Sequence, residues 1–361
     1  MVKKYGIIGC GMMGHEHIAN IDLLEGAKVD VVYDPVASLA ESASKKARGA
    51  SIAPTIEALV TRPDLDAIVI VSPNNIHIDN LEEISKHKDI PILCEKPFYT
   101  HPREEARLDS FLKKHKSPVW IAMEYRYMPA ITQFLEQASE VTGGIKMFTI
   151  KEHRFPFLEK IGDWNRFNAN SGGTLVEKCC HFFDLMRLTL GSEPVRVTAS
   201  AGQMVNHLDE VYDGKTSDIW DGGYVIFDFE NGARAMLELC MFADGTKWNE
   251  EISAVGSKGK IECKLPGPQR FWPEHLGVPP HSQVSLFPRH PKNPVTKDVI
   301  VDEALISAGD HHGSTFFQHQ KFLKVLNGNG VVEVTPQDGK KAVQMGLAAQ
   351  LAASENRVVE F

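Results

Sequence analysis

A carboxylate and an imidazole lie four residues apart in the segment GGTLVEKCCHFFD, which runs from Gly172 to Asp184. The spacing of Glu177 and His181 puts both side chains on one face of a predicted helix, where both can act on one substrate. Asp184 follows three residues later, and we expect it to lie near enough to His181 to orient the imidazole ring. This arrangement suits the transfer of a proton to or from a hydroxyl group.

The same three side chains have the spacing of metal ligands on one helix, which is an alternative interpretation of the motif. No further cluster of ligand residues is evident in the sequence, so we favour proton transfer and expect no metal. Six cysteines lack the paired spacing of a zinc site, and we expect them to be reduced thiols. They are Cys10, Cys94, Cys179, Cys180, Cys240 and Cys263, of which the adjacent pair is expected to fill the core.

A glycine-rich loop near the N-terminus predicts a dinucleotide site. The loop Gly9-Cys10-Gly11-Met12-Met13-Gly14 matches GxGxxG, follows the strand-like run YGIIG and precedes the helical run HEHIANIDLL. Gly9 permits the tight turn, and Gly11 lets backbone N–H groups approach a pyrophosphate at the start of a helix. Gly14 permits close packing of that helix on the strand.

The acid at the end of the second predicted strand indicates which dinucleotide is bound. Asp34 lies about 20 residues beyond Gly14, at the spacing typical of the ribose-binding acid. Its carboxylate can accept hydrogen bonds from both ribose hydroxyls, whereas a 2′-phosphate would meet a like charge with no adjacent arginine. We therefore expect NAD to be preferred over NADP.

The first part of the chain alternates apolar, strand-like runs with helical patterns. The runs are YGIIG, VDVVY, AIVIV, IPILC and VWIAM. Continuous apolar runs indicate strands buried on both faces, so residues 1–122 are predicted to form a doubly wound parallel α/β sheet, the Rossmann arrangement. Two polar loops follow its later strands: Ser72-Pro73-Asn74, and Cys94-Glu95-Lys96-Pro97.

Those two loops stand at the carboxyl ends of parallel strands, where ligands bind in open α/β sheets. An ammonium group there can hydrogen-bond a substrate oxygen and favour release of its proton. Position and the neighbouring Glu95 therefore make Lys96 a candidate functional residue, although a lysine before a proline is usually a solvated surface residue.

Residues 123–361 have a different pattern and are predicted to form an α+β domain. Apolar and polar residues alternate in VRVTASAG, GYVIFDF, ARAMLELCMF, EISAVGS and GKIECKL, which is typical of an antiparallel sheet with one face covered by helices. The links at residues 230–232 and 256–259 resemble hairpin turns. The stretch from Pro266 to Pro294 is predicted to be a long surface loop. Two helices are predicted after it, at about residues 315–326 and 336–354.

Composition restricts the class of partner. The 361 residues carry 39 basic and 47 acidic side chains without long runs of either sign, which argues against nucleic acid. No apolar stretch is long enough to span a membrane, and no signal peptide is evident. We expect a cytoplasmic protein that acts on a small molecule.

The glycine fingerprint, Glu95-Lys96-Pro97 and the motif GG-x3-E-x3-H-x2-D, in this order and spacing, resemble the glucose-fructose oxidoreductase / inositol dehydrogenase / MocA (Gfo/Idh/MocA) family. The likeness covers nearly the whole chain. It implies that the second domain is a large, open, mostly antiparallel sheet whose outer face serves oligomerisation, so that a homodimer or homotetramer is expected. It also implies an active site between the domains that oxidises a secondary hydroxyl of a sugar, sugar acid or cyclitol, or catalyses the reverse reduction.

The resemblance also implies roles for individual residues. Lys96 matches the family's active-site lysine and His181 its general acid/base, while Glu177 stands where many members have aspartate. Ser72, Pro73, Asn74 and His77 match the loop under the cofactor, whereas Glu124 stands where an amide is common. Lys178 is expected to pair with Glu177 or with a substrate carboxylate. The remaining candidates for the substrate pocket are Arg126, Tyr127, Arg154, Trp164 and Arg166.

Two alternatives to a dehydrogenase stay open. One is a hydrolase or epimerase of the same family, which oxidises a sugar transiently and retains its NAD. The other is a non-enzymatic regulator that binds NAD, although a sensor has no need of the proton-transfer groups Lys96 and His181.

Overall fold

The computed structural model describes residues 2–361, which form two compact units. The first unit contains the chain up to Glu124 together with Glu303–Val343, and the second contains Tyr125–Asp302 together with Gln344–Phe361. The predicted boundary at residues 122 and 123 lies close to the first crossing between units. The sequence, however, assigns residues 303–343 to the second domain, whereas they pack within the first unit.

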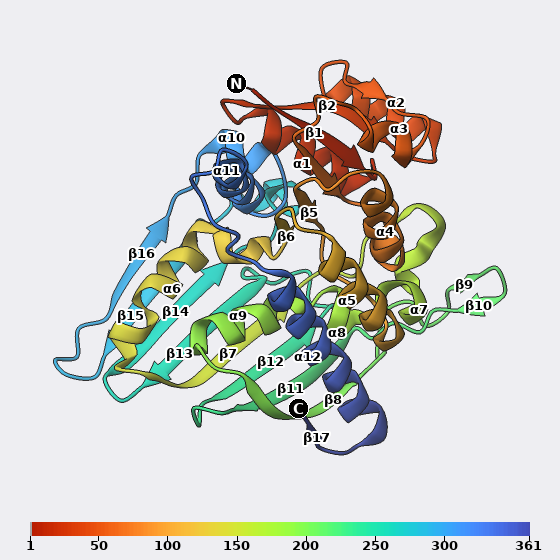
Figure 1. Ribbon diagram of the computed structural model, residues 1–361. Helices are drawn as coiled ribbons and strands as arrows, with labels where there is room; N and C mark the ends of the chain where they lie inside the picture. Colours follow the sequence, from red (N-terminus) through yellow and green to blue (C-terminus); the bar gives the residue numbers. More distant parts are fainter. Residues whose placement is uncertain (1) are drawn as a thin grey trace. The chain divides into compact units, whose positions relative to one another are not determined.

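The first unit is built on a six-stranded parallel sheet with the strand order β3-β2-β1-β4-β5-β6 (Figure 1). The strands are β1 (Lys3–Ile8), β2 (Ala27–Tyr33), β3 (Ser51–Ile52), β4 (Ala67–Ile70), β5 (Ile92–Cys94) and β6 (Val119–Ile121). Five of them coincide with the predicted apolar runs. Strand β3 escapes prediction because two exposed residues at a sheet edge carry no hydrophobic pattern.

These strands are connected by helices α1 (Met12–Asp22), α2 (Ala37–Lys46), α3 (Ile56–Val60), α4 (His77–His87) and α5 (Glu105–Lys114). Two helices of the late segment also belong to this unit, α10 (Glu303–Ser307) and α11 (Ser314–Leu326). Helix α11 packs on α1, and its Phe322 ring meets the edges of the Tyr5 and Trp120 rings at 6.2 and 6.1 Å. These apolar contacts explain why the late segment belongs to the first unit.

The second unit contains a nine-stranded sheet with the order β16-β15-β14-β13-β7-β12-β11-β8-β17. Its strands are β7 (Ile145–His153), β8 (Pro194–Gly202), β11 (Gly222–Phe229), β12 (Arg234–Cys240), β13 (Glu250–Gly256), β14 (Gly259–Leu265), β15 (Ser282–Pro288), β16 (Val295–Val299) and β17 (Val359–Glu360). All neighbouring pairs are antiparallel except β7 and β12. The predicted hairpins β11–β12 and β13–β14 are both present.

The predicted surface loop at residues 266–294 is only partly irregular. It contains β15, which pairs with β14 and with β16 and so extends the sheet. The prolines and glycines that flank this short strand hide its pattern in the sequence. A further two-stranded ribbon, β9 (Val211–Tyr212) with β10 (Lys215–Thr216), also lies outside the predicted strands.

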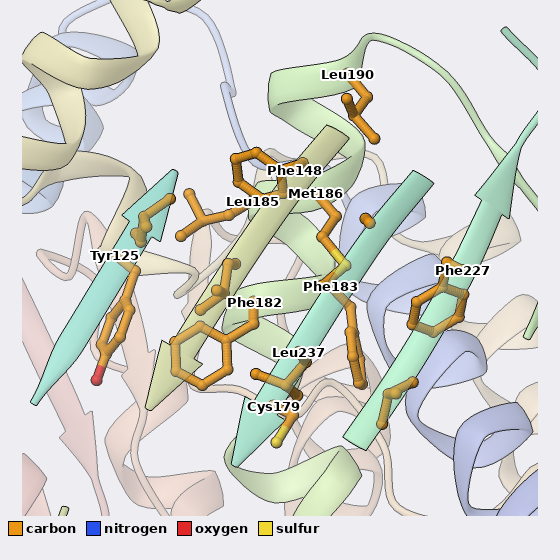
Figure 2. Packing of buried hydrophobic residues seen from close by; sticks show 14 of the residues in the cluster. Tyr125, Phe148, Cys179, Phe182, Phe183, Leu185, Met186, Leu190, Phe227 and Leu237 are labelled. Carbon is orange, nitrogen blue, oxygen red and sulfur yellow. The ribbon is translucent and has the colours of Figure 1, made fainter. Parts of the chain in front are cut away.

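Helices α6 (Pro129–Thr142) and α9 (Cys180–Leu190) cover one face of this large sheet, as does the later part of α12 (Pro336–Glu355) (Figure 1). Figure 2 shows Phe182, Phe183 and Met186 of α9 packed among side chains of the sheet. The rings of Phe183 and Phe227 meet edge to face at 5.2 Å. This apolar layer fixes α9 on the sheet and therefore fixes the position of His181.

None of the helices in residues 2–361 is long and apolar enough to cross a membrane.

Candidate functional site

The glycine loop after β1 has the geometry that a dinucleotide requires. Gly9 has φ +101°, and a Cβ there would lie 2.5 Å from the carbonyl carbon of Val71. A Cβ at Gly14 would lie 2.4 Å from the carbonyl oxygen of Gly9, so neither position accepts a side chain. At Gly11, in contrast, nothing lies within 4 Å, and the N-terminus of α1 has no side-chain cap. Backbone N–H groups at this N-terminus are thus open to a pyrophosphate, and the loop fits NAD.

Asp34 is held beside this loop, immediately after β2. Its Oδ2 accepts a hydrogen bond from the backbone N–H of Cys10 at 2.8 Å, and its Oδ1 accepts one from Val36 at 2.8 Å. A carboxylate has about four acceptor positions, so these two bonds leave capacity for ribose hydroxyls. The link to Cys10 fixes the acid relative to the glycine turn.

A buried histidine joins the two polar loops at the carboxyl ends of β4 and β5. The Nδ1 atom of His77 lies 2.8 Å from the carbonyl oxygen of Pro97, and its Nε2 atom lies 3.0 Å from that of Ser72. Burial lowers the pKa of this imidazole. The loop that carries Lys96 is therefore tied to the Ser72-Pro73-Asn74 loop, and Lys96 itself is half-buried.

Glu95, the neighbour of Lys96, ends a chain of buried hydrogen bonds. Its Oε1 lies 2.8 Å from Nε2 of His17 on α1, and Nδ1 of His17 lies 2.7 Å from Nε2 of His319 on α11. Burial raises the pKa of Glu95, but the hydrogen bond and charge of His17 and the charge of Lys96 outweigh burial and lower it. The lysine loop, the helix of the glycine fingerprint and α11 are thus connected through one carboxylate.

A second polar cluster of the first unit surrounds Glu16 and Glu124. His311 Nδ1 lies 2.7 Å from Glu16 Oε1, and its Nε2 lies 3.9 Å from Glu124 Oε1. Burial raises the pKa of Glu124 to about 7, with a further contribution from Glu95. The surroundings of Glu124 therefore favour its protonated form more than water does.

The motif segment of the second unit is two helices rather than the one that the spacing predicts. Helix α8 (Thr174–Glu177) ends before α9 begins at Cys180, with a turn at residues 178–179. The carbonyl of Thr174 accepts from the N–H groups of both Lys178, at 3.0 Å, and Cys179, at 3.3 Å, which widens the turn. Glu177 and His181 therefore lie on either side of this irregular turn. Both side chains are buried.

Lys178 faces the sheet. Its Nζ lies 2.8 Å from Glu152 Oε1 and 2.5 Å from the hydroxyl of Tyr125. The sequence instead favours a pair with Glu177 or with a substrate carboxylate. The difference arises because the turn at Lys178 directs its side chain toward β7, where Glu152 is completely buried.

Asp184 forms a two-point ion pair with Arg126. The distances are 2.6 Å from Nε to Oδ2 and 2.5 Å from Nη2 to Oδ1, and both side chains are at most 9% exposed. The expectation from spacing is that Asp184 orients His181. Both carboxylate oxygens of Asp184 thus accept from Arg126, and this bidentate pair holds the guanidinium against α9. The orientation of His181 by Asp184 and a contact of Arg126 with a substrate stay predictions.

Of the other predicted substrate residues, two arginines have partners within the second unit. Arg154 lies 3.4 Å from Glu152 and 4.2 Å from the centroid of the Phe155 ring, and Arg166 lies 3.3 Å from Glu210. Trp164 is half-buried in the short 3₁₀ segment Ile161–Arg166, and Tyr127 is buried in the 3₁₀ segment Glu124–Tyr127. Their part in substrate binding stays a prediction.

Tyr125 is the site residue that sequence reasoning missed. Its ring stacks on that of His181, with 4.2 Å between centroids and 10° between planes. The two residues are far apart in sequence and neither periodicity nor a motif links them, so only the fold reveals the contact. Among residues 2–361 no group of three His, Cys, Asp or Glu side chains has the arrangement of a metal site.

Comparison with known proteins agrees with this geometry. Residues 3–123 match the family model described as "Oxidoreductase family, NAD-binding Rossmann fold", and residues 138–361 match "Oxidoreductase family, C-terminal alpha/beta domain". The chain belongs to the Gfo/Idh/MocA oxidoreductase family. The fold and the NAD-binding domain that the sequence predicts are thereby confirmed.

Individual Gfo/Idh/MocA members are distant in sequence. An uncharacterized oxidoreductase of Bacillus subtilis is 27% identical over 257 residues, which cover 70% of this chain and 71% of the relative. The inositol 2-dehydrogenase of Rhizobium meliloti is 26% identical over 267 residues, covering 73% of this chain and 76% of the relative. A solved levoglucosan dehydrogenase in complex with NADH and levoglucosan superimposes with a TM-score of 0.82 at 18% identity, covering 100% and 99% of the two chains.

Proposed function

We propose that this protein is an NAD-dependent dehydrogenase of a secondary hydroxyl group on a sugar, sugar acid or cyclitol. The observation that carries the proposal is the arrangement at the carboxyl edge of the first sheet. There the open glycine turn after β1 and the Lys96 loop after β5 flank the Ser72 loop after β4. Relatives that are named for inositol and levoglucosan support a polyol substrate.

The proposed chemistry assigns a role to each candidate side chain. The glycine loop and Asp34 would hold NAD, which, when bound, would supply the hydride acceptor or donor for the substrate carbon. Lys96 binds the substrate oxygen through its ammonium group, and His181 takes the proton of the hydroxyl as general base. Glu177 stabilises the imidazolium that results or positions a neighbouring hydroxyl. Histidine suits this task because its ordinary pKa lies near neutral pH.

The preference for NAD over NADP is part of the proposal. Asp34 would place a like charge beside a 2′-phosphate, and its carboxylate is fixed by the N–H of Cys10. Equal affinity of NADH and NADPH in a fluorescence titration would contradict this preference.

The test of function is a panel of inositols, aldoses, sugar acids and glycosides, assayed at 340 nm with NAD⁺ and with NADP⁺. We expect absorbance to rise with one group of substrates and NAD⁺. His181→Ala and Lys96→Ala should each lower turnover by roughly 10²-fold or more, the scale of general acid–base participation. A His181→Ala enzyme within a few fold of wild type would remove His181 from the mechanism.

A retained-cofactor hydrolase or epimerase is the second candidate in the family. It would consume its substrate while the absorbance at 340 nm stays constant, and NAD would co-purify with the protein. If no substrate reacts, as judged by absorbance and by product analysis, the NAD-binding regulator would be favoured.

The self-association expected from the family resemblance is also proposed here. Met147, Tyr224 and Ile226 are 61%, 55% and 45% exposed on the second unit, which supports a face that another copy covers. Light scattering would show a dimer or tetramer, and a monomer at micromolar concentration would contradict the proposal.

A further inference from the structure

Tyr125 and His181 form a parallel stack in the interior of the second unit. The ring centroids are 4.2 Å apart, the planes differ by 10°, and Tyr125 is only 3% exposed. An offset or parallel stack of this kind restricts an imidazole to one plane, because rotation about its side-chain bonds would drive the ring into the tyrosine. The orientation of His181 thus depends on where the Tyr125 ring is held.

The hydroxyl of Tyr125 is anchored by charged groups beneath the ring. Lys178 Nζ lies 2.5 Å from the hydroxyl oxygen, and Glu250 Oε1 lies 3.3 Å from it. The lysine is itself bound to Glu152 at 2.8 Å. Glu152 and Glu250 are direct partners in the register of β7 and β13, so two neighbouring strands of the rigid sheet support the anchor.

The flanks of the Tyr125 ring are also occupied. Phe182 meets it edge to face at 5.8 Å, and the Lys178 ammonium lies 4.8 Å from its centroid. Phe182 therefore holds the ring edge, while Lys178 contacts both the ring face and the hydroxyl. The charged groups around this anchor are Glu152 on β7, Arg154 after it, Glu177 and Lys178 at the α8–α9 turn, and Glu250 on β13.

We propose that Tyr125 is a positioning residue for His181, and that Lys178 serves it by holding the tyrosine hydroxyl. The inference rests on the proposed function for the role of His181, but the stack itself does not. Both oxygens of Asp184 also accept from Arg126, at 2.6 and 2.5 Å, so this carboxylate is not dedicated to the imidazole. The face of the Tyr125 ring restricts the plane of the imidazole.

Two substitutions separate the ring of Tyr125 from its hydroxyl. Tyr125→Phe keeps the stacked ring and removes the anchor, whereas Tyr125→Leu removes both. We expect kcat to fall a few fold in the Phe variant and about 10- to 100-fold in the Leu variant, the scale expected for a misplaced reacting group. The KM should change by less than about threefold in both, because an oriented imidazole acts in the transition state.

Phe148→Leu is the matched control for lost packing. Phe148 is a buried ring of the same core, on β7, and packs against Phe134 at 6.1 Å between centroids. The substitution opens a similar space beside the same sheet. The ring contact that it removes is with Phe134 and not with Tyr125. It should lower thermal stability like Tyr125→Leu and leave kcat within about twofold. Equal losses of kcat in the two variants would overturn the proposal.

A second readout does not depend on activity. The ring current of Tyr125 shifts the imidazole protons of His181 upfield in a proton NMR spectrum, and His181→Gln identifies those signals. The shift should persist in Tyr125→Phe and disappear in Tyr125→Leu. If no substrate is found while the shift behaves in this way, the function of the enzyme is wrong but the positioning is right. Unchanged signals in the Leu variant would refute the positioning itself.

Discussion

The carboxylate of Glu95 accepts a hydrogen bond from Nε2 of His17 over 2.8 Å, and both side chains are buried in the first unit. The pair joins the helix of the glycine fingerprint to the loop of Lys96. Removal of the donor leaves a buried carboxylate short of a partner, which is costly. His17→Leu should lower the free energy of unfolding of this unit by about 2–3 kcal/mol, as measured by urea denaturation.

His87→Leu provides the control for this substitution. His87 Nε2 lies 2.9 Å from Glu83 Oε1, an equivalent pair at nearly equal distance, but it lies on the outer side of α4 with side chains 21% and 35% exposed. Water can replace the lost hydrogen bond there, so the change should stay below about 1 kcal/mol. Equal effects of the two substitutions would show that burial of the Glu95–His17 pair contributes nothing.

Substitutions at two glycines of the fingerprint should affect NADH binding and the stability of the fold separately. Gly11→Ala places a methyl group where the protein has no atom within 4 Å, so the fold should tolerate it, while NADH affinity should fall at least about tenfold. Gly14→Ala brings its Cβ to 2.4 Å from the Gly9 carbonyl oxygen and should cost about 1–3 kcal/mol of stability. Thermal melts without cofactor and NADH fluorescence titrations measure both. Normal NADH binding by Gly11→Ala would show that the cofactor does not approach this turn.

Acid should weaken the first unit through Glu16. Burial raises the pKa of this carboxyl, but the charge of His311 and hydrogen bonds from His311, Thr315 and Asp310 outweigh burial and lower it to about 2. A depressed pKa gives stability that is present above the unfolded value, near 4.5, and is lost as the pH falls toward 2. The stability advantage of wild type over Glu16→Gln should therefore shrink by about 2 kcal/mol between pH 6 and pH 3. A difference that stays constant across this range would exclude Glu16 as the titrating group.

A rise in pH from about 4.5 to neutral should weaken the second unit through Glu250. Burial and the neighbouring Glu152 raise its pKa to about 7. The folded state then holds a proton that the unfolded state releases above about pH 4.5, so stability falls as the pH rises toward 7. Relative to wild type, Glu250→Gln should gain on the order of 3 kcal/mol between pH 4.5 and pH 8 in chemical denaturation. Glu251→Gln, at a carboxylate that pairs with Lys264 at 3.0 Å near solvent, should show no such gain.

The sequence predicts much of the fold because strong local patterns specify it. Continuous apolar runs identify five strands of the first sheet, and the alternating runs identify the central strands of the second. The two-residue β3 and the strand β15 inside a proline-rich stretch escape because their local patterns are too short or too interrupted.

The candidate site is predicted only where its residues are close in sequence. Gly9, Gly11 and Gly14 follow from one loop, and Glu177 and His181 from one segment. The contacts of Tyr125 with His181, of Lys178 with Glu152 and of His17 with Glu95 join residues far apart along the chain. Such pairs depend on strand register and on the turn between α8 and α9, which side-chain type and spacing do not specify.

The return of residues 303–343 to the first unit sets an order for biosynthesis. When the ribosome has completed Glu124, all six strands of the first sheet exist, but α11 with its His319 and the preceding His311 have not been made. The polar groups of α1 that these residues contact must wait until the whole second sheet up to β16 has been translated. The first unit therefore cannot be completed before Val343 has been translated, although its sheet is finished at Glu124. A fragment that ends at Glu124 should acquire a cooperative thermal transition only when residues 303–343 are supplied as a separate peptide.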